Sequence, residues 1–305
     1  MIKGKRILIT GGNGFLGRHL VAKIKEMQPK SIRISDIDKY DLRNYKDCVR
    51  ATRGMDIVIH LAAKVGGIGF NKDYPADLFD DNILMGTFMM KAARINKVKK
   101  YLAMGTICAY PKFTPVPFKE ENLWNGYPEE TNAPYGLAKK MQLVQAQAYR
   151  DQFGFNSIFL LPVNLYGPGD NFNPKSSHVI PALIRKFIEA KKNNDREVVV
   201  WGTGKPSREF LYVEDAADAI IMAVEKYEKP DPVNLGAGFE IKIKDLAILI
   251  KKLTDYKGKI VWDKTKPDGQ PRRMLDVSKA KNEFGFVAKT SFEKGLKNTI
   301  DWYTK

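Results

Sequence analysis

Cysteine and histidine are scarce in this chain of 305 residues. The two cysteines, Cys48 and Cys108, are too few for a disulfide framework, and neither stands in a metal-ligand spacing. The three histidines, His19, His60 and His178, show no ligand spacing either. We therefore expect neither a disulfide-stapled domain nor a metal site.

Long apolar runs are also absent. No apolar stretch approaches the roughly 18 residues that a membrane-spanning helix needs. The first residues lack the apolar core and the small-residue cleavage site of a signal peptide. Hydrophobic residues make up 44% of the chain and charged residues 28%, which is typical of a globular soluble protein. The sequence predicts a cytoplasmic protein without a membrane partner.

Negative charge is the minority sign, with 35 Asp and Glu against 51 Lys and Arg, giving a net charge of +16. Such an excess could favour nucleic acid, an anionic membrane or a phosphorylated small substrate. The lysines are dispersed, however, and the densest cluster, at residues 97–100, is too short for a basic tail. We interpret most of the charge as a solvated surface and expect no nucleic-acid partner.

The first half of the chain alternates short β-branched runs with helical periodicity, a pattern typical of a parallel sheet covered by crossover helices. Strands are predicted at residues 6–10, 32–35, 56–61, 101–104 and 157–161, and helices at 15–27, 76–96 and 135–152. The sequence therefore predicts an α/β fold built on a doubly wound parallel sheet.

From about residue 166 the elements become shorter and loops rich in Gly, Pro and Asn appear. Helices are predicted at 180–191, 215–226, 243–253 and 292–303, and strands at 198–201, 210–213, 233–235 and 260–262. We expect this smaller C-terminal α/β part, residues 166–305, to cover the carboxyl edge of the sheet, where ligands of open α/β sheets bind. Parts of 208–232 are expected to complete the first domain, residues 1–165.

A glycine-rich turn joins the first predicted strand to the first helix. Its candidate ligand contacts are Gly11, Gly14, Phe15, Leu16 and Gly17. Glycines allow a tight bend and a close backbone approach, and the helix amino end presents free N–H groups to a pyrophosphate. Residues 1–165 are therefore predicted to form an NAD(P)-binding Rossmann domain.

The adenosine end of that site is predicted at Asp36, nineteen residues after Gly17. A carboxylate there would accept hydrogen bonds from ribose hydroxyls and repel a 2′-phosphate, which favours NAD and leaves NADP as the alternative. Asp36 or Asp38 could instead cap a turn, and Arg33 and Arg43 lie near enough to complicate the choice.

Two further segments are predicted to contact the cofactor. The residues are Asp41, Leu42, Leu61, Ala62 and Ala63. The first two precede a helical stretch and could meet the adenine edge, while the small residues at 62 and 63 suit close packing against a dinucleotide. For His60, just before them, we expect a packed and hydrogen-bonded role rather than catalysis.

Tyr135 and Lys139 stand at positions i and i+4 of one predicted helix, so their side chains share a face. A neighbouring ammonium stabilises a phenolate and lowers the pKa of the phenol. We predict that Tyr135 exchanges a proton with a sugar hydroxyl or ketone while hydride moves to or from nicotinamide. Thr106, beyond the strand at 101–104, could hydrogen-bond the reacting oxygen, although a strand-end hydroxyl is often only structural.

Together these features resemble the extended short-chain dehydrogenase/reductase family, also called the NAD-dependent epimerase/dehydratase family, with Thr106, Tyr135 and Lys139 matching its catalytic triad. Within the family, the similarity is closest to the GDP-L-fucose synthase branch and covers nearly the whole chain. The matching segments are residues 61–68, 108–112, 164–172, 177–183, 201–204, 208–210 and 266–272. The resemblance implies a homodimer acting on a GDP-activated 4-keto sugar of the manno series.

The resemblance also implies individual roles. Cys108 and His178 match the base and the acid that invert C3 and C5 beside a 4-keto group. Without the resemblance, we would interpret Cys108 as a buried small residue and His178 as a loop histidine. Implied cofactor contacts are Pro162 and Leu165, and implied substrate contacts are Asn164, His178, Val179, Lys186, Trp201 and Arg208. Lys186 stands where the family usually has an arginine, with Arg185 adjacent.

Some positions depart from the family pattern. Thr106 and Ile107 stand where the family usually has two serines, and Ala109 trims the site. The Asp36 argument for NAD also conflicts with a reductase that consumes NADPH. Our leading hypothesis is a 3,5-epimerase/4-reductase of a GDP-sugar. The alternatives are an NAD-holding GDP-sugar C4 dehydrogenase or epimerase, for example on GDP-mannose or a GDP-manno-heptose, and a silent dinucleotide-sensing protein.

Overall fold

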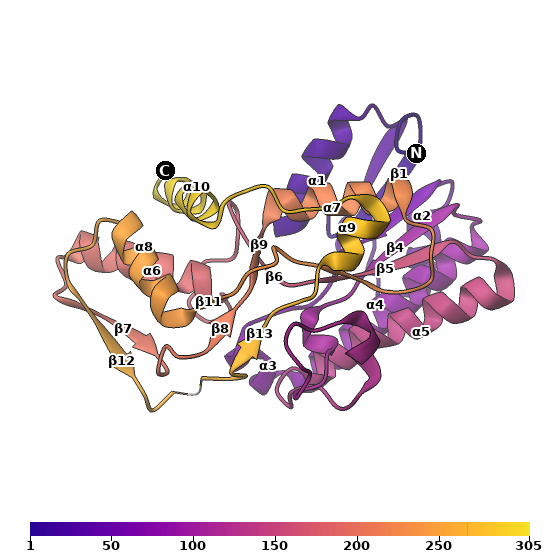
Figure 1. The fold of residues 1–305 in the computed structure, drawn as a ribbon. Coiled ribbons are helices and arrows are strands. Elements are labelled where there is room, and N and C mark those ends of the chain that lie inside the picture. The colour runs from indigo at the N-terminus through magenta and orange to yellow at the C-terminus, as the bar shows by residue number, and fades with distance from the viewer. Residues whose placement is uncertain (267) are drawn as a thin grey trace.

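A six-stranded parallel sheet forms the centre of the molecule in the computed structural model, which describes residues 1–266 and 268–305 (Figure 1). The strands lie in the order β10-β5-β4-β3-β1-β2. Their bounds are β1 Arg6–Thr10, β2 Ser31–Ser35, β3 Ile57–His60, β4 Lys100–Met104, β5 Ser157–Pro162 and β10 Val233–Leu235. Both faces of β3 and β4 are buried, which is why these strands are almost continuously apolar. The predicted doubly wound fold is confirmed.

Helices cover both faces of this sheet (Figure 1). On one face α1 packs against α7, and on the other α4 packs against α2 and α5. The helix bounds here are α1 Phe15–Glu26, α2 Tyr45–Thr52, α3 Ile68–Asp73, α4 Pro75–Ile95, α5 Ala133–Phe153, α7 Val213–Lys226 and α9 Ser278–Phe284. Pro134 lies in the first turn of α5, and Gly154 ends that helix in a left-handed conformation with φ of 62°.

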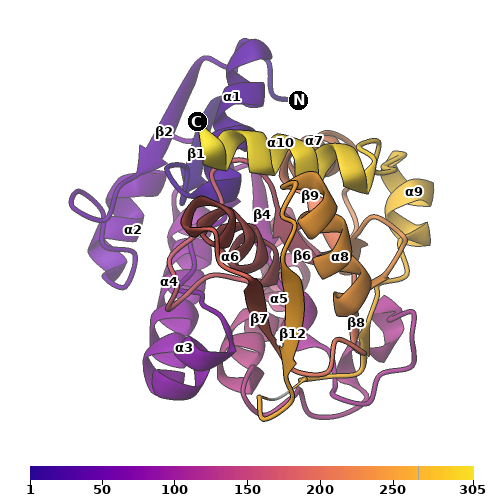
Figure 2. The same ribbon diagram turned by 90° about the vertical axis from the view of Figure 1, so that its left-hand side faces the viewer.

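The remaining elements form a smaller part beside the carboxyl ends of the strands (Figure 2). Its helices are α6 Val179–Asn193, α8 Ile243–Leu253 and α10 Phe292–Thr304. Three short sheets join β6 Asn164–Tyr166 to β9 Phe210–Tyr212, β7 Glu197–Trp201 to β12 Lys259–Asp263, and β8 Ser207–Arg208 to β11 Ile241–Lys242 and β13 Arg272–Arg273. The strand predicted at 210–213 is one residue shorter, because Val213 already begins α7.

Two hydrophobic clusters underlie these parts. The larger one fills the space between the central sheet and its helices and includes Ala216, Ile220 and Phe284 from late in the chain. The smaller one lies among α6, α8, α10 and β7. No helix in residues 1–266 and 268–305 is both long and apolar enough to cross a membrane.

Candidate active site

A cavity of about 1230 Å³ runs from the carboxyl ends of the central strands to the small sheets. Such a volume exceeds the ~300–1,000 Å³ of a typical single-ligand pocket. All but one of the predicted site residues line it: Gly11, Gly14, Phe15, Leu16, Gly17, Asp41, Leu42, Leu61, Ala62, Ala63, Thr106, Cys108, Tyr135, Lys139, Pro162, Asn164, Leu165, His178, Val179, Lys186, Trp201 and Arg208. Of the resembling segment 266–272, Pro267 lies outside the described residues.

The glycine-rich turn has room for backbone only. A Cβ on Gly17 would lie 2.1 Å from the carbonyl oxygen of Gly11, and Gly11 itself has a φ of +68°. Gly14 caps α1 without a side chain, and the first helical hydrogen bond runs from the N–H of Arg18 to its carbonyl. The preceding N–H groups of α1 therefore face the cavity free of helical partners, which fits a pyrophosphate.

The adjacent wall is fixed by a buried hydrogen-bond chain. The Thr10 hydroxyl lies 2.8 Å from Nδ1 of His60 and accepts a hydrogen bond from the backbone N–H of Ala62. Burial lowers the pKa of His60 well below its usual value, so its imidazole is neutral. His60 thus positions the residues at 61–63 from inside the core, in agreement with the packed role predicted for it.

Asp36 is the one predicted site residue that does not line the cavity. Its neighbours do line the cavity: Ser35 is the last residue of β2, and Ile37 lies in the turn that follows. The Asp36 carboxylate accepts a hydrogen bond from the N–H of Asp38. Asp36 therefore organises a turn, as the alternative interpretation held, and its contact with the cofactor stays a prediction.

Ser35, Tyr40 and Arg43 all line the cavity. The guanidinium of Arg43 is held by the carboxylates of Asp41 and Asp81, at 2.8 and 3.4 Å. Arg33 is directed elsewhere, since it donates to carbonyl groups at the end of α2. This part of the cavity wall therefore carries a hydroxyl, a guanidinium and the carboxylates of Asp41 and Asp81.

Tyr135 and Lys139 come to the cavity from the first turns of α5. Gly136 lets the helix approach closely, because a Cβ there would lie 2.4 Å from the carbonyl oxygen of Cys108. Burial raises the pKa of Tyr135 well above its usual range, with Cys108 adding to the rise and Thr106 opposing it. Burial lowers the pKa of Lys139 to about 7.

These directions correct the prediction that Lys139 lowers the pKa of Tyr135. Burial dominates both groups, and the ammonium is not among the causes acting on the phenol. A phenol that keeps its proton at neutral pH is suited to donate it. The arrangement therefore favours Tyr135 as the acid of a reduction.

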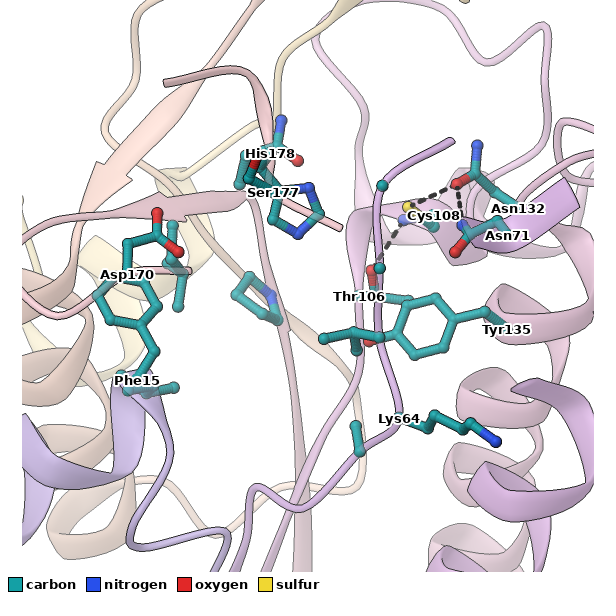
Figure 3. Close-up of a pocket in the computed structure, with 18 of the residues that line it drawn as sticks. Phe15, Lys64, Asn71, Thr106, Cys108, Asn132, Tyr135, Asp170, Ser177 and His178 are labelled. Carbon is teal, nitrogen blue, oxygen red and sulfur yellow. Dashed lines mark hydrogen bonds between the residues drawn. The ribbon is translucent and has the colours of Figure 1, made fainter. Parts of the chain in front are cut away.

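Cys108 and His178 reach into the cavity from opposite sides (Figure 3). Cys108 lies in a short 3₁₀ helix, residues Ile107–Ala109, whose amino end is capped by the Thr106 hydroxyl. His178 directly precedes α6. Enclosure by the surrounding protein lowers the pKa of its imidazole, although the ring remains accessible from the cavity.

The far end of the cavity is built by cationic and aromatic side chains. Arg208 lies in β8 and donates hydrogen bonds to the carbonyl groups of Ser207 and Asp268. Burial and the nearby Arg273 lower the pKa of Arg208 to about 10. Lys186 lies 5.7 Å from the ring centre of Trp201, whose side chain is 62% exposed at the rim. Cations and a flat indole are suited to a nucleotide diphosphate.

The sequence interpretation missed several residues of the cavity wall. Asn71, Glu129, Asn132 and Arg273 all line it and surround Cys108, and only their position beside matching segments could have pointed to them. Asp170 belongs to a segment quoted for the resemblance but received no role (Figure 3). Burial raises its pKa to about 7, and one carboxyl oxygen is buried without a hydrogen-bond partner.

The glycine turn, the enclosed Tyr135 and Lys139, and the parallel sheet define a nicotinamide-dependent enzyme of the doubly wound class. The chain belongs to the NAD dependent epimerase/dehydratase family, which it matches over residues 7–236. The resemblance derived from the motifs is confirmed.

Among individual proteins, the chain is 43% identical to GDP-L-fucose synthase 1 of Arabidopsis thaliana, over 99% of this chain and 94% of that protein. Its structure resembles a GDP-6-OMe-4-keto-L-xylo-heptose reductase from C. jejuni, with a TM-score of 0.94, 27% identity and coverage of 100% and 99% of the two chains. It also resembles a GDP-L-fucose synthetase from Naegleria fowleri bound to NADP, with a TM-score of 0.90, 29% identity and coverage of 100% and 95%.

Proposed function

We propose that the chain is a GDP-sugar 3,5-epimerase/4-reductase that acts on a 4-keto sugar of the manno series. The observation that carries the proposal is a single cavity joining the glycine turn, Tyr135, and the opposed pair Cys108 and His178. Relatives that cover the whole chain and carry the name GDP-L-fucose synthase support the GDP-sugar substrate.

The glycine turn would hold a nicotinamide dinucleotide, a group that would supply the hydride for C4. The residues of this chain handle the protons. Tyr135 donates its phenolic proton to the C4 oxygen as that oxygen gains negative charge, and Thr106 is proposed to hold the same oxygen. Lys139, buried one helical turn away, then provides a positive charge next to the phenolate.

Epimerisation precedes this step in the proposal. A 4-keto group acidifies the C–H bonds at C3 and C5, because the electron pair left behind delocalises onto the carbonyl oxygen. Cys108 removes the proton from one face of the ring, and His178 returns a proton to the other. The placement of the two side chains on opposite sides of the cavity supports this division of labour.

For the nucleotide, Arg208 and either Lys186 or Arg185 are proposed to bind the diphosphate, with Trp201 beside the base or ribose. Val179 opens α6, so its free N–H adds a helix amino end to the same anion site. Asn164 lies between this end and the cofactor end, with its amide donating to the carbonyl of Glu209.

We propose NADPH as the preferred cofactor in place of NAD. The cavity wall at the proposed adenosine end carries the hydroxyl of Ser35 and the guanidinium of Arg43, which is paired with Asp41 and Asp81. A hydroxyl and a guanidinium suit a 2′-phosphate, which a carboxylate would repel. NADP in the Naegleria fowleri relative supports the same choice.

We further propose that residues 1–165, with returning segments from 208–232 and also β10 and α9, form the dinucleotide-binding domain and that the rest of 166–305 mainly binds the nucleotide sugar. The separate hydrophobic clusters support this division. A homodimer and a cytoplasmic location stay predictions.

The decisive experiment incubates the purified chain with GDP-4-keto-6-deoxy-mannose in D₂O, with NADPH or NADH, and identifies the products by NMR. The proposal predicts deuterium at C3 and C5 and a reduced C4, faster with NADPH. Reduction without deuterium uptake would leave a simple C4 reductase. NAD copurifying in equal amount with the chain would instead favour the redox-neutral GDP-sugar epimerase or dehydrogenase.

A further inference from the structure

The Cys108 sulfur lies between an acceptor and a cation. Its Sγ is 3.7 Å from Oδ1 of Asn132 on one side and 3.7 Å from Nη1 of Arg273 on the other. These distances are within hydrogen-bonding range for sulfur, whose radius exceeds that of oxygen. A thiol can donate its proton to the amide oxygen, and a thiolate can accept from the guanidinium.

The orientation of the Asn132 amide follows from its other contacts. Its Nδ2 donates to a carboxylate oxygen of Glu129, and its Oδ1 accepts a hydrogen bond of 3.1 Å from the amide of Asn71 (Figure 3). Because a carboxylate requires a donor, the NH₂ group must face Glu129. The oxygen is thereby left to face the sulfur.

Arg273 is held in place by the short sheet on the opposite side of the cavity. It pairs in register with Arg208 across β13 and β8, and its Nε donates to Oε1 of Gln270. Gln270 in turn donates through Nε2 to the carbonyl of Lys112, at 2.6 Å. The guanidinium is therefore a fixed part of the wall beside Cys108.

We infer that Asn132 and Arg273 are positioning residues that control the protonation and aim of the Cys108 sulfur during epimerisation. This inference rests on the proposed function, because it assumes that Cys108 is the base. Arg273 stabilises the sulfur as a thiolate before reaction. The thiolate forms an S–H bond as the C–H bond of the sugar breaks, and the electron pair of that bond passes to the C4 oxygen.

After this transfer the new thiol keeps its proton and donates a hydrogen bond to Asn132 Oδ1, which turns the S–H bond away from the sugar carbon. His178 then delivers a proton to the opposite face, so the ring carbon regains a C–H bond with inverted configuration. Solvent exchange removes the sulfur proton and restores the imidazole proton, and no oxidant or reductant is consumed.

The other cysteine provides an internal comparison. Cys48 is buried, donates to the carbonyl of Leu42 at 3.2 Å and has the carboxylates of Asp47 and Asp41 near it. Burial and these charges raise the pKa of the Cys48 thiol to about 12. The chain thus holds one thiol among anions and another beside a cation.

The first test needs no substrate. Alkylation of the full-length chain by iodoacetamide, followed by mass spectrometry over a pH series, reports the thiolate fraction at each cysteine. We expect Cys108 to react and Cys48 to stay protected. Arg273→Gln should slow Cys108 alkylation at pH 7 about tenfold or more, Arg273→Lys should retain most of the rate, and Arg272→Ala, exposed on the same strand, should leave it unchanged.

The second test follows catalysis. Arg273→Gln and Asn132→Ala should reduce deuterium uptake at C3 and C5 about tenfold or more, while the C4 reduction of a sugar that needs no epimerisation changes less than threefold. Equal loss of both activities, or an alkylation profile of Arg273→Gln identical to the unaltered chain, overturns the inference. If the unaltered chain shows no deuterium uptake, the proposed epimerisation fails, and alkylation alone decides whether Arg273 controls the sulfur.

Discussion

The two ends of the cavity are lined by different kinds of chemical group. At the dinucleotide end the wall is mostly backbone and small side chains, contributed by the glycine turn and by residues 61–63 at the end of the neighbouring strand. At the sugar end the wall consists of long polar side chains, with Cys108, His178, Arg208 and Arg273 arriving from separate parts of the chain. The first end is thus shaped mainly by backbone, and the second presents charged and titratable side chains to the cavity.

This difference predicts how substitutions behave. A change at the dinucleotide end should alter packing, so stability and cofactor affinity should fall together. A change at the sugar end should remove one interaction, so one kinetic constant should change while the fold persists. Tyr135 lies where the ends meet, and its loss should affect chemistry more than binding.

Tyr135→Phe should give the largest effect. Removing the phenolic proton should lower the rate of C4 reduction about 10²–10⁴-fold. Dinucleotide affinity and deuterium uptake at C3 and C5 should change little, because neither needs that proton. Stopped-flow measurement of NADPH oxidation and NMR measurement of exchange would separate the steps, and reduction at the normal rate would remove Tyr135 from the proposal.

Arg208→Ala tests the sugar end. Losing hydrogen bonds to a charged diphosphate costs about 1.5–3 kcal/mol, so KM for the GDP-sugar should rise roughly 10–150-fold at nearly constant cofactor affinity. Arg208→Lys should recover part of the loss, since a lysine keeps the charge but not the bidentate geometry. A parallel rise in the cofactor Kd would contradict the separation of the two ends.

Gly17→Ala tests the dinucleotide end. The new Cβ would lie 2.1 Å from a backbone oxygen, so the turn must shift, at a cost of about 1–3 kcal/mol. We expect a lower Tm and weaker NADPH binding, measured by calorimetry and by quenching of protein fluorescence. Gly69→Ala is the matched control, because a Cβ at Gly69 meets nothing within 4 Å. Its Tm and its affinity for NADPH should be unchanged.

Ser35→Asp should have the smallest effect and the most selective one. A carboxylate facing the cavity would repel a 2′-phosphate and accept hydrogen bonds from a 2′-hydroxyl. The ratio of kcat/KM for NADPH to that for NADH should fall about tenfold. Asp36→Asn, which removes a charge at a residue that does not line the cavity, should change this ratio little. A large shift on Asp36→Asn would restore the original interpretation of that residue.

The comparison also explains which predictions succeeded. Three of the correct predictions concern local features: the turn at residues 11–17, strand β3 at 57–60 and helix α5. Glycine spacing specifies the turn, and hydrophobic periodicity specifies the strand and the helix. Whether the side chain of Asp36, one residue beyond β2, reaches the cofactor depends on its direction, which the local sequence does not specify. The pKa of Tyr135 was predicted in the wrong direction because spacing reports proximity but not burial.

Glu209 illustrates what spacing cannot reveal. It lies in a segment that carries the resemblance, next to Arg208, and a carboxylate there could pass for a catalytic acid. In the fold it is fully buried and accepts hydrogen bonds from the backbone N–H groups of Ala237, Gly238 and Leu275. It therefore ties together backbone segments of the C-terminal half and takes no part in the cavity wall.

By itself the sequence determined the parallel α/β layout, the place of the dinucleotide turn and the Tyr135 to Lys139 spacing, because each depends on residues within one or two adjacent elements. Only the tertiary structure decided that Arg273 and Asn132 flank the same sulfur and that Ser35 and Arg43 line the cavity while Asp36 does not. The two contacts to the sulfur join residues 24 and 165 positions apart, and the lining of the cavity depends on the direction of single side chains, so no local pattern encodes either.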